Sequence, residues 1–172
     1  MKDEQFKKTE KLLYRYFEDE KKVEILKREL ELLREQYNSI EKILRTNNFN
    51  LLSAADLGSP GFEERVQTSS TGKGVAEKEM LNHVEYLLNT QKTIIKKEFK
   101  AKEKIRNIEI NNIRLRCNIE MLCEEHKMFI ELKYKEKKRM EDIYLLINRS
   151  RSNTFELRVK IVEDIARWLN II

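Results

Sequence analysis

Residues 23–44, VEILKRELELLREQYNSIEKIL, contain the pattern that decides the fold class. The apolar side chains recur in alternating steps of three and four residues, and this period is typical of helices that supercoil around one another. We call this set the first stripe; it consists of Val23, Leu26, Leu30, Leu33, Tyr37, Ile40 and Leu44. The pattern predicts a coiled-coil helix over residues 1–46. Its stripe must pair with a second copy of the chain or with a later helix of the same chain.

A second long helix with its own coiled-coil stripe is predicted over residues 75–122. The same spacing returns at Ile105, Ile108, Leu115, Ile119 and Leu122, and Asn112 stands where the pattern calls for an apolar residue. A single buried asparagine in such a stripe can fix the register of the two helices. Alternatively, Asn112 faces water because the helix bends or ends nearby.

Basic residues dominate the part of this helix between positions 92 and 106. Seven lysine and arginine residues stand there against two glutamates, so the segment has the same net charge, +5, as the whole chain. Such a surface could contact phosphate groups, which contribute most of the affinity of nucleic-acid complexes. The alternative is an ordinary solvated helix face.

Residues 47–74 are predicted to form a linker between the two long helices. All four glycines and the only proline of the chain lie in this segment, together with many serine, threonine and asparagine residues. Gly72-Lys73-Gly74 lacks the serine or threonine that follows the lysine of a phosphate-binding P-loop, so no nucleotide site is expected there.

The composition supports an all-α protein without a membrane span. Among 172 residues, 38% are charged and 40% apolar, and glycine and proline are scarce, whereas sandwiches and barrels need frequent turns. No apolar run approaches the length of about 18 residues that a membrane helix requires. No secretory signal is recognisable, and two cysteines cannot form a disulfide framework. We therefore expect a cytoplasmic protein.

The segment 123–172 predicts a helix-turn-helix domain. A short helix over 140–147, a turn at 148–150 and a longer last helix follow one another. Arginine and asparagine can recognise bases in the major groove, and basic residues before the first helix can contact phosphates. The candidate DNA-binding residues are Arg149, Arg151, Ser152, Asn153, Arg158 and Lys160, preceded by Lys137, Lys138 and Arg139. The alternative is a helical hairpin that only closes a bundle.

The stretch HKMFIELKYKEKKRMEDIYLLINRSRSNTFELRVKIVEDIARWL, residues 126–169, resembles region 4 of sigma-70 factors. The similar proteins are the ArpU/RinA-type phage transcriptional regulators, in which such a module follows a helical N-terminal part. The resemblance implies sequence-specific binding to double-stranded DNA, contact with RNA polymerase and activation of phage late genes in a bacterial host cell. This chain has Asn148-Arg149 where the family has a glycine followed by an aliphatic residue.

No catalytic arrangement is recognisable in the sequence. The two histidines and two cysteines do not have the spacing of a zinc site, and no nucleophile motif is present. We expect a non-enzyme without metal or cofactor. The alternative to a DNA-binding regulator is a coiled-coil structural or adaptor protein, which would dimerise without binding DNA.

Overall fold

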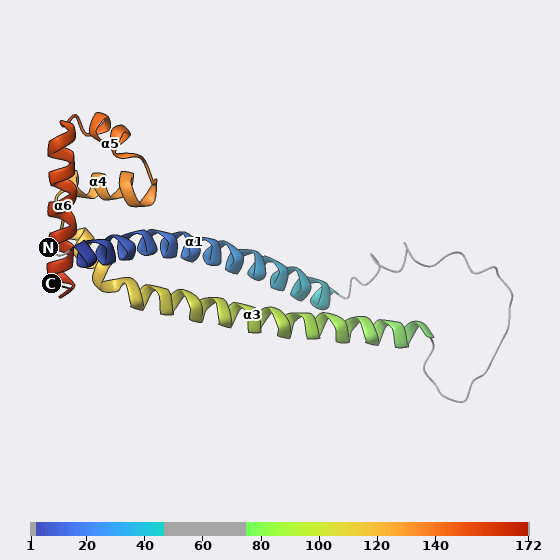
Figure 1. Cartoon of the computed structure of the whole chain (residues 1–172). Helices are drawn as coiled ribbons and strands as arrows, with labels where there is room; N and C mark the ends of the chain where they lie inside the picture. Colours follow the sequence, from blue (N-terminus) through green and yellow to red (C-terminus); the bar gives the residue numbers. More distant parts are fainter. Residues whose placement is uncertain (1–2, 47–74, 172) are drawn as a thin grey trace, which may run out of the picture. The chain divides into compact units, whose positions relative to one another are not determined.

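The computed structural model describes residues 3–46 and 75–171, and the described residues form helices without any strand (Figure 1). The expected all-α class is confirmed. The helices are α1 (Asp3–Thr46), α3 (Val75–Glu120), α4 (Glu124–Ile130), the π-helical turn η2 (Glu131–Lys135), α5 (Met140–Leu146) and α6 (Arg151–Trp168). The predicted linker over 47–74 lies outside the described residues. No described helix is long and apolar enough to cross a membrane.

The chain divides into two compact units, and both long helices contribute to each. We call Met1–Lys27 with Glu103–Ile172 the terminal unit, because it contains both ends of the chain, and Arg28–Lys102 the middle unit.

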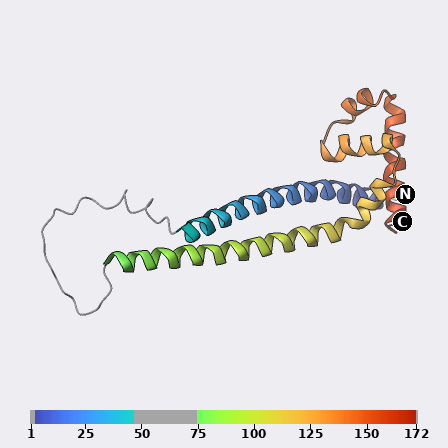
Figure 2. The same ribbon diagram turned by 180° about the vertical axis from the view of Figure 1, so that it is seen from behind.

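In the middle unit, α1 and α3 run side by side in opposite directions (Figures 1 and 2). Leu30 and Leu33 of the first stripe are buried, and the remaining stripe residues there, Tyr37, Ile40 and Leu44, are half-buried. The buried residues of α3 in this unit are Leu87, Ile94 and Ala101. A single chain therefore covers this part of the stripe, and a second copy is not needed for it.

In the terminal unit, the first part of α1 lies beside the last part of α3. Val23 and Leu26 are half-buried, whereas Leu115 and Leu122 of the second stripe are buried. Asn112 is half-buried, and its Nδ2 atom lies 3.5 Å from Oδ2 of Asp19 on α1. This asparagine therefore faces the neighbouring helix rather than open water.

The core of the terminal unit contains side chains from every described helix. Its fully buried members include Leu13 of α1, Phe129 and Ile130 of α4, Tyr134 of η2, Ile143 of α5, and Ile161, Val162 and Ile165 of α6. The two ends of the chain also meet, because Nε2 of Gln5 donates to the carbonyl oxygen of Ile171 at 3.1 Å. Residues 123–171 therefore share one core with α1 and with the end of α3, across the predicted boundary at residue 123.

Candidate nucleic-acid interface

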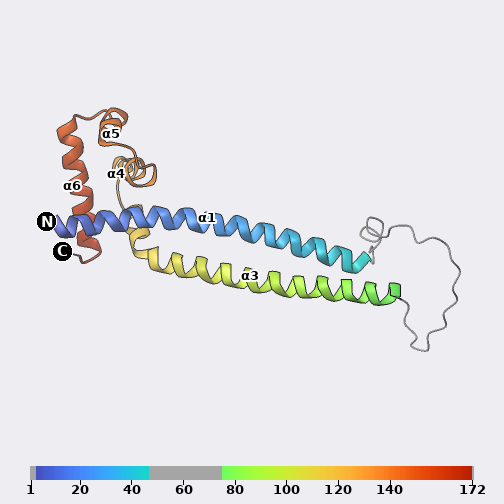
Figure 3. The same ribbon diagram turned by 45° about the vertical axis from the view of Figure 1, so that its right-hand side comes forward.

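Helices α5 and α6 are joined by the short turn Ile147–Ser150 (Figure 3). Ser150 caps α6, since its hydroxyl accepts a hydrogen bond from the backbone N–H of Asn153 at 3.3 Å. Such caps satisfy a donor that the first turn of a helix leaves unpaired. The expected turn and the expected start of the last helix are both present in the structure.

Asn148 provides the change of chain direction in this turn. Its φ angle is 51°, in the left-handed region that glycine and asparagine adopt most readily. The next residue closes the turn, because the N–H of Arg149 donates to the carbonyl oxygen of Tyr144 at 3.1 Å. Asparagine therefore occupies, at this position, a conformation for which glycine is the usual choice.

The first turn of α6 presents polar and basic side chains to solvent. Arg151, Ser152 and Asn153 are all exposed, as is Lys160 two turns later. The guanidinium carbon of Arg151 lies 6.0 Å from the ring centre of Phe155, within range of a cation–π contact. Among the described residues, none forms an ion pair with Arg151 or Lys160. These four side chains are thus available to an external polar partner.

Arg158 has a different role from the one expected for it. Its guanidinium donates two hydrogen bonds to the carboxylate of Glu10 on α1, from Nε to Oε1 and from Nη2 to Oε2, both at 2.8 Å. Only 24% of the Arg158 side chain and 14% of the Glu10 side chain are exposed. Its guanidinium carbon also lies 5.2 Å from the ring centre of Phe6. The expectation that Arg158 contacts DNA is therefore corrected: it holds α6 against α1.

The buried polar cluster around Glu10 was not predicted from the sequence. The hydroxyl of Tyr134 donates to Oε1 of Glu10 at 2.8 Å, and this is the same oxygen that Arg158 contacts. Burial and the negative charge of Glu10 raise the pKa of Tyr134, so this phenol stays protonated and donates. Burial lowers the pKa of Arg158, but hydrogen bonding to Glu10 and the charge of Glu10 outweigh it, and the net pKa is raised.

Of the other predicted DNA-binding residues, three form ion pairs with glutamates of the same chain and one is exposed without such a partner among the described residues. Arg149 is half-buried and its Nε atom lies 2.6 Å from Oε1 of Glu125 on α4, so this arginine joins α4 to the turn. Lys137 lies 3.0 Å from Glu18 and Lys138 lies 2.9 Å from Glu136. Arg139 is exposed and has no ion-pair partner among the described residues.

His126 of α4 lies near the basic side chains of this surface. Burial lowers its pKa, and the positive charge of Lys160 lowers it further. The imidazole is therefore neutral at pH 7, and acidification adds a positive charge beside Lys160 and Arg149.

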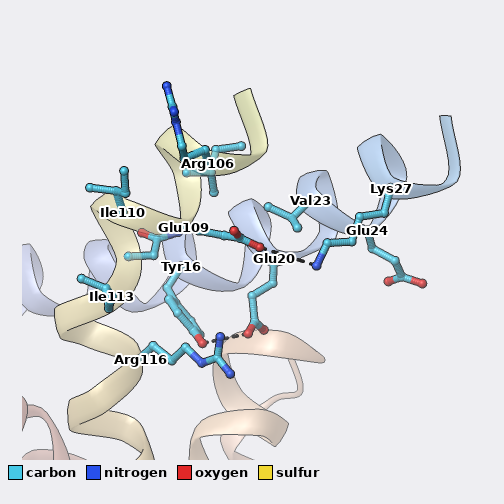
Figure 4. A pocket seen from close by; sticks show the side chains of 12 residues that line it. Tyr16, Glu20, Val23, Glu24, Lys27, Arg106, Glu109, Ile110, Ile113 and Arg116 are labelled. Atoms are coloured by element: carbon cyan, nitrogen blue, oxygen red, sulfur yellow. Dashed lines mark hydrogen bonds and ion pairs between the residues drawn. The ribbon is translucent and has the colours of Figure 1, made fainter. Parts of the chain in front are cut away.

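A separate groove of about 560 Å³ lies between α1 and α3 of the terminal unit (Figure 4). Its lining combines apolar side chains, among them Val23, Ile110 and Ile113, with ion-paired ones such as Lys27 and Glu109, 3.5 Å apart. The hydroxyl of Tyr16 donates to Oε1 of Glu20 at 2.7 Å, and burial together with Glu20 raises the pKa of this tyrosine. A phenol of that kind is a poor general base, and the described residues contain no group of three or more metal-ligating side chains.

Comparison with protein-family models, with curated proteins and with solved structures gave no match.

Proposed function

We propose that the protein is a sequence-specific DNA-binding regulator that uses α5, the turn and α6 as a helix-turn-helix. The observation that carries this proposal is the exposed first turn of α6, where Arg151, Ser152 and Asn153 follow a serine-capped helix start. The first residues of a recognition helix are the ones that reach base edges in the major groove. Arginine can then bind guanine with two hydrogen bonds, and asparagine can bind adenine in the same manner.

The proposed interface has two parts. Arg151, Ser152 and Asn153 contact bases, while exposed Lys160 and Arg139 contact phosphates, with Lys137 and Lys138 released from their glutamate partners. The ion pairs of Lys137 and Lys138 are solvent-exposed and therefore weak, so phosphate oxygens can replace the glutamates at small cost. Arg149 and Arg158 position α6 through Glu125 and Glu10.

The resemblance to sigma-70 region 4 and to the ArpU/RinA-type regulators makes the proposal more specific. In that case the protein acts beside RNA polymerase at phage or prophage late promoters in the bacterial cytoplasm, as a non-catalytic factor. The helical hairpin of α1 and α3 then forms an antiparallel coiled coil.

The test is selection of bound fragments from random double-stranded DNA, followed by titration of the selected site at several salt concentrations. We expect affinity to fall steeply with salt, because basic side chains release counterions from the phosphates. The double variant Arg151→Ala/Asn153→Ala should lose about 1–3 kcal/mol of binding free energy for each lost base contact. Arg167→Ala is the matched control, since this arginine is exposed in the last turn of the same helix.

Two results would contradict the proposal. The first is equal binding by the wild type and the double variant, and the second is the absence of any salt-dependent binding.

A smaller prediction separates base contacts from phosphate contacts. Lys160→Ala should weaken binding to all sequences about equally and reduce the salt slope by roughly one unit.

An adaptor function is the second candidate, and one observation favours it. Several large apolar side chains of the long helices are exposed, among them Ile25, Leu32, Ile110 and Ile113. Apolar surface of this kind often marks a protein–protein contact. This function predicts a protein partner and no affinity for DNA, so the titration above also separates the two candidates.

A further inference from the structure

Helix α3 also has an exposed apolar stripe in the middle unit, on a face other than the one turned toward α1. We call it the outer stripe; it consists of Leu81, Leu88, Ile95 and Phe99. The steps of seven, seven and four residues keep these side chains on one helix face. Their exposed fractions are 49%, 43%, 53% and 70%, whereas Leu87 and Ile94 beside them are buried.

An exposed apolar stripe of this length on one helix indicates a surface that binds another molecule. Soluble chains rarely leave contiguous apolar stripes in water, and a stripe of heptad spacing fits a second helix with the same spacing. In the middle unit, the described part of α1 lies against a different face of α3, the one that contains the buried Leu87 and Ile94.

We propose that the outer stripe binds the outer stripe of a second copy of this chain, with the two α3 helices antiparallel. A two-fold axis next to position 90 brings the two ends of the outer stripe together, because it places Leu81 opposite Phe99 of the second copy. The same axis places Leu88 opposite Lys92 and Ile95 opposite Glu85 of the second copy. Such an isologous contact closes after two copies and uses the same residues on both sides.

The charge distribution along α3 favours this orientation. Residues 78–91 contain one lysine and two glutamates, a net charge of −1, whereas residues 92–102 contain five lysines and one glutamate, a net charge of +4. An antiparallel pair brings the acidic part of each helix beside the basic part of the other, and Glu85 then lies next to Lys96 of the second copy. A parallel pair would place like charges together, which is unfavourable.

Part of the basic run over 92–106 belongs to this proposed dimer contact. Lys92 lies on the face of the outer stripe and Lys96 beside it, and the long methylene stems of lysine can cover apolar side chains while the ammonium groups stay in water. This contact does not depend on DNA binding, since it lies in the middle unit and the proposed DNA surface lies in the terminal unit.

The experiment is sedimentation equilibrium of the full chain over a wide concentration range, with circular dichroism as a check on helix content. The wild type should sediment as a dimer. Phe99→Glu removes the apolar contact with Leu81, and Ile95→Glu places a second carboxylate opposite Glu85. Each should raise the dissociation constant about tenfold or more. Leu32→Glu is the control: this leucine is 60% exposed on α1 of the same unit, outside the outer stripe, and its variant should remain dimeric.

A charge exchange tests the orientation. Glu85→Lys and Lys96→Glu should each weaken the dimer, and the double variant should restore it, because the two positions lie within one residue of each other across the two-fold axis. A wild type that stays monomeric at all concentrations would overturn the proposal. If that monomer bound vesicles of phosphatidylcholine and phosphatidylserine, the outer stripe would be a lipid contact instead. A double variant that is weaker than both single variants would overturn the antiparallel arrangement.

Discussion

In the middle unit, buried residues recur at regular intervals along two helices, whereas in the terminal unit they come from every described helix and follow no single period. Leu30 and Leu33 keep 8% and 7% of their surface exposed, because two packed helices cover only part of each stripe residue. Ile143, Ile161 and Ile165 of the terminal unit are completely buried. A two-helix contact therefore shields side chains less completely than a core surrounded by several segments.

The more complete burial in the terminal unit should have its largest effect on stability when a buried side chain is shortened to alanine. Ile161→Ala should destabilise the terminal unit by about 2–5 kcal/mol, because it removes buried methylene groups and leaves a cavity. Leu33→Ala should cost about 1–2 kcal/mol, within the usual range for single substitutions. Urea unfolding followed in parallel by circular dichroism and by fluorescence of Trp168, the only tryptophan, measures both effects, since Trp168 belongs to the terminal unit.

Equal losses of unfolding free energy in Ile161→Ala and Leu33→Ala would contradict the expected difference between the two units. So would a fluorescence transition that shifts as much for Leu33→Ala as for Ile161→Ala, because that result would mean that the two units unfold as one.

The next effect concerns the polar contact between α1 and α6. Glu10→Gln should destabilise the terminal unit by about 1–3 kcal/mol, since it leaves the half-buried guanidinium of Arg158 without a charged partner. Glu18→Gln removes the exposed partner of Lys137 and should cost less than about 0.5 kcal/mol. Trp168 fluorescence in urea measures both variants. A Glu10 variant as stable as the Glu18 variant would show that the buried cluster does not stabilise the unit.

The regular part of this structure could be predicted from the sequence because helix periodicity is a local property. The bounds of α1 and α3, the inward position of Leu30 and Leu33, and the turn before Ser150 all follow from residues close to one another in the chain. The period shows that a face is covered, but it does not identify the covering segment. For the first stripe, the choice between a second copy and the same chain therefore had to come from the structure.

Arg158 illustrates what local patterns miss. Its partner Glu10 stands 148 residues earlier, and no spacing rule joins the two positions. One indication was nevertheless present, since Val162 and Ile165 follow Arg158 by four and seven residues and share its helix face. An arginine on the apolar face of a helix needs a charged partner when it is buried. Spacing alone does not separate Arg151 from Arg158, because Arg151 precedes it by seven residues on the same helix face; the structure has Arg151 exposed in the first turn of α6.

The cap of α6 gives a smaller effect. Ser150→Ala should destabilise the terminal unit by about 1 kcal/mol, because the N–H of Asn153 loses its acceptor, while Ser150→Asp should retain stability. Ser152→Ala is the control, since its side chain is exposed and accepts no capping hydrogen bond. The measurement is again Trp168 fluorescence in urea. A loss of equal size at both serines would mean that the capping hydrogen bond has no separate contribution.

The smallest expected effect is the pH dependence that His126 introduces. Burial and Lys160 lower its pKa in the folded protein below the value of about 6.5 expected for an unfolded chain. Below that pH the unfolded chain binds the proton more readily, so this contribution to stability is present above pH 6.5 and is lost as the pH falls toward the folded pKa. Between pH 7 and pH 5.5 the wild type should therefore lose more stability than His126→Asn. Lys160→Gln should raise the pKa of His126 in an NMR titration, because it removes a nearby positive charge. An unchanged titration would show that burial alone lowers this pKa and that Lys160 points away from the imidazole.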